Sequence, residues 1–178
     1  MRIARFAPFV VLARAALASL GPLLGLAPAL AADESELKAA IVFNVLVFVE
    51  WPDELKTIEL CASADNPLLP ALRRLDGRDI RNRIFKLQVL ASDVAPASCR
   101  AAFVDASDRT KHAPMVKNLS DAGVFVISDD AEAPPRSTAV IMQRAGTRIA
   151  LDVNLPAVRD ARVQVSSKLL RLARTVKE

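Results

Sequence analysis

The amino terminus of the chain has the three-part pattern of a secretory signal peptide. Residues 1–14 are basic and contain no acid, residues 15–26 are apolar, and residues 27–31 read Ala-Pro-Ala-Leu-Ala. Small residues at the two positions that signal peptidase recognises predict cleavage after Ala31. The alternative is an uncleaved anchor, but glycine and proline residues interrupt the apolar run, and a span needs about 20 apolar residues. We therefore expect export to the periplasm, with 1–31 removed and 32–178 forming one domain.

Removal of the leader changes the charge of the protein. Residues 1–31 hold three arginines and no acid, so the number of Lys and Arg residues falls from 24 to 21, against 20 Asp and Glu residues. The mature chain is thus nearly neutral, and its basic isoelectric point is largely a property of the leader. We therefore expect no nucleic acid as a partner.

Both cysteines, Cys61 and Cys99, lie in the predicted mature part. An even cysteine count in an exported protein indicates a disulfide, and two cysteines allow a single intrachain pairing. Closing a loop of about 39 residues stabilises a fold by about 4 kcal/mol in the chain-entropy model.

The mature part alternates between short segments with strand and helix patterns. An apolar stripe at spacings of four and three (Leu37, Ile41, Val45, Phe48) predicts a first helix over Glu34–Val49. The run Val124–Ser128 is the most β-prone, which predicts a place at the sheet centre. Further strands are expected over 57–62, 79–90, 101–104, 138–143 and 148–155, and further helices over 68–75, 111–119 and 168–174. The sum is an α/β single domain: a mixed β-sheet of about five to six strands with flanking helices and a C-terminal hairpin plus helix.

Several of these segments together resemble a known family. The opening Lys38–Asn44, continuing into Phe48–Pro52, is similar to the start of YfiR-like periplasmic proteins. The cysteine at Cys61 and the endings Asp152–Leu155 and Val165–Ala173 extend the resemblance over nearly all of the mature chain. The chain departs from the family pattern in having one cysteine pair, where the best-known member has two.

The resemblance implies a periplasmic regulatory protein. The best-known member represses an inner-membrane diguanylate cyclase by contacting its periplasmic portion, which lowers cyclic-di-GMP output. An outer-membrane lipoprotein relieves that repression, and family members can form homodimers. The resemblance thus implies a partner of this kind for the present chain, either a diguanylate cyclase or a sensor kinase.

No catalytic constellation can be assembled from the sequence. His112 is the only histidine, so a metal site would need carboxylates from distant segments. Ser166 lacks a G-x-S-x-G elbow and is expected to cap the last helix. Asp129, Asp130 and Glu132 lack the calcium-loop pattern and are interpreted as a solvated acidic loop. We therefore expect no enzyme, no metal and no cofactor.

Two features are candidates for a partner or ligand surface. Trp51, the only tryptophan, follows the first helix, where a core anchor is the simpler interpretation and a ligand cleft the alternative. Lys168, Arg171 and Arg174 are spaced by three residues and predict a basic face on the last helix, which is either solvated or in contact with an acidic partner. The first hypothesis is a regulator that binds a membrane signalling protein. The alternative is a periplasmic small-molecule sensor with a pocket beside Trp51.

Overall fold

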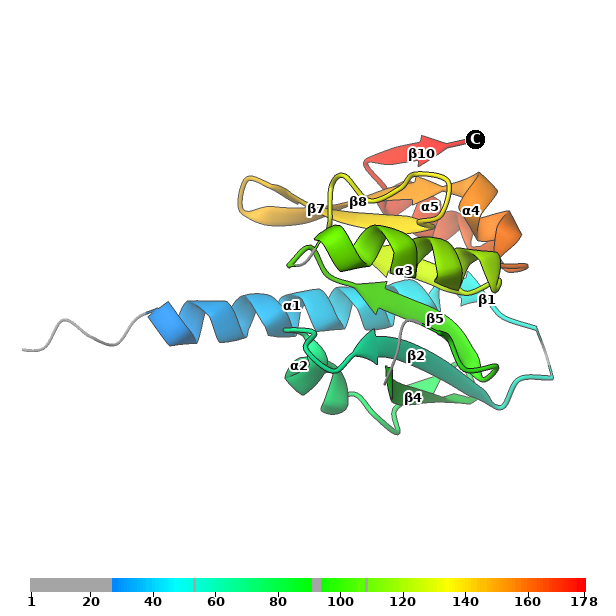
Figure 1. Cartoon of the computed structure of the whole chain (residues 1–178), viewed down its shortest axis with the longest axis horizontal. Helices are drawn as coiled ribbons and strands as arrows, with labels where there is room; N and C mark the ends of the chain where they lie inside the picture. The colour runs from blue at the N-terminus through cyan, green and yellow to red at the C-terminus, as the bar shows by residue number, and fades with distance from the viewer. Residues whose placement is uncertain (1–26, 53, 91–93, 108) are drawn as a thin grey trace, which may run out of the picture.

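The computed structural model describes residues 27–178 except 53, 91–93 and 108, and for 27–33 and 109–112 it describes the backbone alone. Residues 1–26 of the predicted signal peptide lie outside the described residues, and cleavage after Ala31 stays a prediction. The described residues form one α/β domain around an eight-stranded mixed sheet (Figure 1). The α/β class is confirmed, although the sheet has more strands than the five to six expected.

After the first helix, the elements follow a β-α-β pattern with the β7–β8 hairpin later in the chain, as the sequence predicts. The helices are α1 (Ala27–Val47), α2 (Leu69–Arg73), α3 (Arg109–Asp121), α4 (Leu155–Asp160) and α5 (Ser167–Leu172). The strands are β1 (Val49–Glu50), β2 (Thr57–Ser63), β3 (Asp79–Ile80), β4 (Arg83–Leu90), β5 (Cys99–Val104), β6 (Phe125–Ser128), β7 (Val140–Ala145), β8 (Arg148–Asn154), β9 (Gln164–Val165) and β10 (Thr175–Lys177).

The strand order of the main sheet is β10-β8-β7-β6-β5-β2-β4-β3. Strands β4, β2, β5, β6 and β7 are parallel neighbours, while β8 returns antiparallel to β7 and β3 antiparallel to β4. The predicted central strand, β6, is one of the two middle strands, and all four of its residues are buried. Gly146, with φ +65, forms the tight turn of the β7–β8 hairpin, because a positive φ strains other residues.

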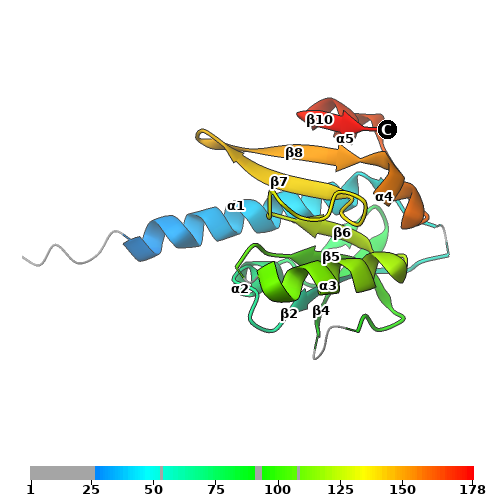
Figure 2. The ribbon, with the colours of Figure 1, turned by 45° about the horizontal axis from the view of Figure 1, so that its top comes forward.

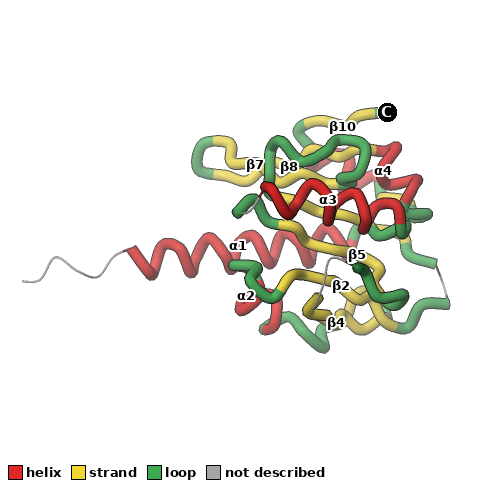
Figure 3. The backbone as a smooth tube through the Cα atoms, viewed as in Figure 1, coloured by secondary structure: helices red, strands yellow, loops and turns green. Residues whose placement is uncertain are grey.

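Two hydrophobic clusters lie on the two faces of the sheet. Helix α3 packs on one face, and α1 crosses the other (Figures 2 and 3). Alternation along β5 divides its side chains between them: Phe103 belongs to the α1 cluster and Val104 to the α3 cluster. The buried cysteines belong to the α3 cluster.

The first helix ends earlier than expected, and only part of the predicted stripe is buried. Helix α1 stops at Val47, and Val49 instead pairs with Val165 in the small β1–β9 sheet. The most deeply buried residues of α1 include Val42 and Leu46, whereas Leu37, the first residue of the predicted stripe, is 49% exposed. The stripe is thus only partly core: Val45 is 1% exposed, whereas Ile41 and Phe48 are half-buried.

The last helix is shorter than predicted, and a strand follows it. Helix α5 stops at Leu172, and the residues that follow form β10, parallel to β8 at the edge of the sheet. Ser166 caps α5 as expected, since its hydroxyl accepts a hydrogen bond from the backbone N–H of Leu169 at 3.4 Å.

The predicted disulfide is present and joins neighbouring strands. Cys61 of β2 and Cys99 of β5 are bonded, with their Cα atoms 6.0 Å apart. Replacing both with alanine should lower the free energy of unfolding by about 4 kcal/mol, because the unfolded chain regains the entropy of an open loop. Urea unfolding with and without reductant measures the effect, and the double variant serves as the reductant-insensitive control. An unchanged urea midpoint in the variant would contradict the prediction.

Candidate functional site

An apolar groove lies between α1, β8 and α5. We call it the α1–α5 groove, and it encloses about 370 Å³. Its lining residues come from these three elements and the turn after α1: Ile41, Asn44, Val45, Phe48, Leu151, Leu169 and Leu172. None of these side chains is charged, so the groove offers an apolar surface.

The sequence positions the walls of the groove by simple periodicity. Spacings of four and three residues keep Leu37, Ile41 and Phe48 near one side of α1. Leu151 points to the same sheet face as Val153, which belongs to the α1 cluster. Leu172 at the end of α5 is 59% exposed, and Leu37, one turn before Ile41 on α1, is 49% exposed. Leu172 is thus an exposed apolar wall of the groove, and Leu37 extends the apolar stripe of α1 one turn beyond the lining residues.

The three predicted basic residues do not form one face. The Lys168 ammonium lies over the Phe48 ring, 5.0 Å from its centroid, and Arg171 hydrogen-bonds Ser167 within α5. Arg174 lies beyond the helix, where its Nε donates to Asp152 Oδ1 at 3.0 Å. Lys168 and Arg171 thus form a basic rim beside the groove, whereas Arg174 attaches the last residues to β8.

Trp51 serves the core and also borders a cavity. Its indole N–H donates to the carbonyl of Leu46 at 3.0 Å, which satisfies a carbonyl in the last turn of α1. Its ring packs edge to face on Phe125 at 6.1 Å, and the residue is 7% exposed. The core-anchor interpretation therefore describes most of its contacts. The remaining edge lines a second hollow, which we call the Trp51 cavity.

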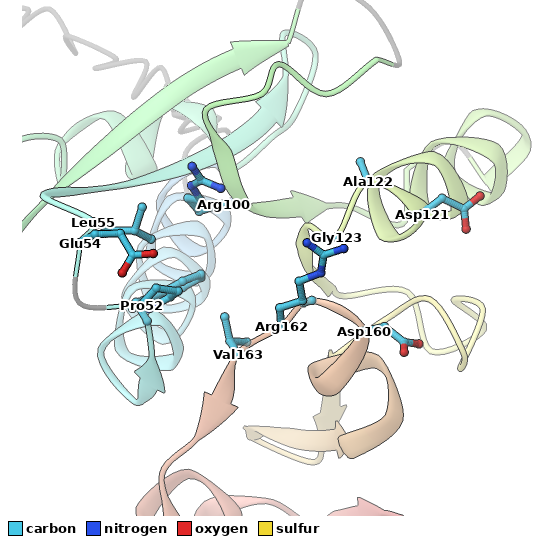
Figure 4. A pocket seen from close by; sticks show the side chains of 12 residues that line it. Pro52, Glu54, Leu55, Arg100, Asp121, Ala122, Gly123, Asp160, Arg162 and Val163 are labelled. Carbon is cyan, nitrogen blue, oxygen red and sulfur yellow. The ribbon is translucent and has the colours of Figure 1, made fainter.

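The Trp51 cavity encloses about 370 Å³ at the amino ends of β5 and β6 (Figure 4). Its walls are Trp51, Pro52, Glu54, Leu55, Arg100, Asp121, Ala122, Gly123, Asp160, Ala161, Arg162 and Val163. The Arg162 side chain reaches towards Gly123, while the carboxylates of Asp121 and Asp160 point away from it. Within the described residues, neither Arg100 nor Arg162 forms an ion pair. Arg162 adopts a φ of +55, a strained conformation for arginine.

The carboxyl ends of the parallel strands carry internal polar contacts. Lys38 of α1 donates to Asp129 Oδ2 at 2.6 Å, and the backbone N–H of Ala106 donates to Asp129 Oδ1 at 2.9 Å. Asp130 is buried, and its carboxylate accepts from the N–H of Glu132. The prediction of a solvated acidic loop is therefore wrong for Asp129 and Asp130, because a lysine 91 residues away in sequence covers this loop.

In the part of the chain that the structure describes, no group of three or more His, Cys, Asp or Glu residues could hold a metal ion. The side chain of His112 lies outside that part. Of the described helices, none is both long and apolar enough to cross a bilayer.

Comparison with known proteins gives a family and a fold. A family model described as YfiR/HmsC-like matches residues 35–174. The crystal structure of a conserved domain protein from Vibrio cholerae O1 biovar El Tor is similar, with a TM-score of 0.52 and 10% identity over 80% of this chain. The match spans 60% of that chain, and at this identity it concerns the fold alone. No curated protein sequence matches.

The pair between Lys38 and Asp129 generates a prediction about pH. Burial of the ammonium lowers the pKa of Lys38, but the hydrogen bond and charge of Asp129, with Glu34 nearby, outweigh burial and raise that pKa above its ordinary value. Lys38→Met should therefore cost about 2 kcal/mol of unfolding free energy at neutral pH, because Asp129, whose side chain is 10% exposed, loses its cation.

The loss of unfolding free energy in Lys38→Met should disappear at high pH. A raised folded-state pKa stabilises the fold below the ordinary lysine value of 10.5, and this contribution disappears as the pH rises through the raised value. Urea unfolding at pH 7, 9 and above 11 should thus show wild type and variant converging only in the last condition. Lys117→Met, which removes an exposed pair with Asp121, is the control and should change stability by less than about 0.5 kcal/mol. A difference that does not vary with pH would contradict the prediction.

Proposed function

The chain belongs to the YfiR/HmsC-like family, and on that premise we propose that it represses an inner-membrane signalling protein by binding its periplasmic portion. The family is one of periplasmic regulatory proteins, which supports a regulatory role for this chain. The predicted signal peptide and the Cys61–Cys99 disulfide fit an oxidising compartment. The proposed target is a diguanylate cyclase, or a sensor kinase, and the proposed outcome is lower cyclic-di-GMP.

The α1–α5 groove is the observation that carries the proposal. An active site is expected to bring polar groups together, whereas no side chain that lines this groove is charged and only the Lys168 ammonium lies over one of its lining rings, that of Phe48. Exposed leucines beside a polar rim are typical of protein interaction sites. The groove therefore supports a binding function over a catalytic one.

The physical basis of repression is a difference in affinity. A membrane receptor that exchanges between an active and an inactive state shifts towards the state that this protein binds more tightly. An outer-membrane lipoprotein that competes for the same protein would release the receptor, and homodimerisation would adjust the free concentration. Both belong to the proposal as further partners.

Deletion of the gene should raise cellular cyclic-di-GMP, because the cyclase loses its repressor. Nucleotide extraction and mass spectrometry measure the change, which should be several-fold, and expression of the wild-type chain should reverse it. Expression without the leader should fail to reverse it, because the protein would not reach the periplasm. Unchanged cyclic-di-GMP in the deletion strain would exclude a cyclase as the target.

The Trp51 cavity supports a second function, that of a small-molecule sensor. Two arginines without ion-pair partners and an aromatic edge face one hollow large enough for a small metabolite. Such a ligand would act by favouring one conformation of the protein for its partner. This alternative concerns a different surface from the α1–α5 groove, so the two functions can be tested separately.

Tryptophan fluorescence tests the sensor function directly, because Trp51 is the only tryptophan and lines the cavity. Titration with a panel of amino acids, nucleotides and organic acids should give a saturable change in emission for a true ligand. Arg162→Gly should weaken that response while relieving the positive φ, so the variant should remain folded. Arg148→Gly, which changes an exposed arginine outside the cavity, is the control. A flat response across the panel would count against a sensor.

A further inference from the structure

We propose that the α1–α5 groove receives an acidic amphipathic helix of about three turns. This inference rests on the proposed function, since the helix would belong to the periplasmic portion of the signalling partner. The proposal specifies the charge and the secondary structure of the partner segment that the groove binds.

The first argument is the shape of the apolar surface. The stripe on α1 that begins at Leu37 reaches the end of the helix at Val47, a length of about 15 Å at 1.5 Å per residue. Leu172 stands across the groove from this stripe, and both leucines expose about half of their surface or more. A helix of about three turns matches this length, and its i, i+3 and i+7 side chains would cover both leucines.

The second argument excludes an extended segment. The floor of the groove is a face of β8, and both edges of β8 are already paired, with β7 on one side and β10 on the other. An extended peptide laid in the groove would therefore find no free edge of β8 and would bury unpaired backbone groups. A helix satisfies its own backbone and needs only apolar contacts from the floor.

The third argument is charge. Lys168 and Arg171 edge the groove, and in the described part of the chain neither forms an ion pair. No residue that lines the groove is acidic. Near these elements Arg174 is neutralised by Asp152 and Arg144 by Glu34, whereas Arg148 at the hairpin end of β8 forms no ion pair among the described residues but does not line the groove. The two uncompensated cations therefore favour a segment with acidic residues along the flank that meets α5.

The same charges argue against a second copy of this chain as the occupant. A twofold contact through the groove would place the same patch of both subunits face to face, so that Lys168 and Arg171 would approach their counterparts. Like charges brought together without a counterion disfavour that contact. The occupant is thus a partner of opposite charge.

The experiment uses the protein purified from the periplasm and a labelled, side-chain-stapled helical peptide of about 14 residues. The peptide carries leucine at i, i+3 and i+7 and glutamate on both flanks, and the staple removes the cost of forming so short a helix. Fluorescence anisotropy measures its affinity. A peptide with the same composition but scrambled leucine positions, and one with lysine flanks, should both bind at least tenfold more weakly.

Variants of the groove give the sharper test. Leu172→Glu should weaken the glutamate peptide at least tenfold, because it places a charge on the apolar wall. Changing both Lys168 and Arg171 to glutamate should weaken the glutamate peptide about tenfold and strengthen the lysine peptide, a reversal that misfolding would not produce. Val94→Glu is the matched control, since Val94 is 75% exposed and does not line the groove, and should leave binding unchanged.

Three outcomes would overturn the inference. The first is absence of binding by the stapled peptide, and the second is binding that Leu172→Glu leaves intact. The third is a wild-type dimer that Leu172→Glu converts to a monomer in light scattering, because a second copy would then occupy the groove. A failed peptide experiment together with raised cyclic-di-GMP on gene deletion would reject the helix and leave the proposed function standing. Peptide binding without a cyclic-di-GMP change on gene deletion would reject repression of a cyclase and leave the helix-binding groove standing.

Discussion

The sheet is wider than a single helix, and this difference in width determines how the helices are arranged on it. Eight strands spaced about 4.8 Å apart make a sheet roughly 34 Å wide, whereas a helix with its side chains is about 10 Å wide. Helix α1 therefore covers only part of its face, and short helices must cover the remainder. The uncovered strip over β8, between α1 and α5, is the α1–α5 groove. Its apolar walls are a consequence of this geometry, and a binding partner could make use of them.

The groove has a fixed shape because α1 is attached at several points. Glu34 of α1 pairs with Arg144 at the tip of the β7–β8 hairpin, and Lys38, near the middle of the helix, pairs with Asp129 after β6. At its carboxyl end, the Trp51 indole binds the Leu46 carbonyl. These contacts reach both the hairpin and the centre of the sheet. A preformed wall of this kind lowers the entropy that a partner loses on binding.

The two candidate surfaces are not where the fold class would first suggest. The five parallel strands have the order 2-1-3-4-5, in which ligands commonly bind at the carboxyl ends of the strands. Here the Lys38–Asp129 pair and the buried Asp130 occupy that edge. The Trp51 cavity lies at the opposite edge, beside Arg100 and Gly123. The usual site of the fold thus carries stabilising contacts, whereas the Trp51 cavity and the α1–α5 groove lie elsewhere.

The sequence alone determined the local elements and the disulfide. Local signals placed three features: β-propensity the central strand, turn residues the hairpin at Gly146, and capping chemistry Ser166. Each depends on residues within a few positions of one another. It missed the short strands β1, β9 and β10, since two- or three-residue strands exist only through a distant partner. Only the tertiary structure showed that part of the apolar stripe of α1 lines a groove against Leu151 and Leu169. The same is true of the contacts of Arg174 with Asp152 and of Lys38 with Asp129. Each of these contacts joins segments far apart in the chain, and no local pattern encodes which distant residue will lie opposite.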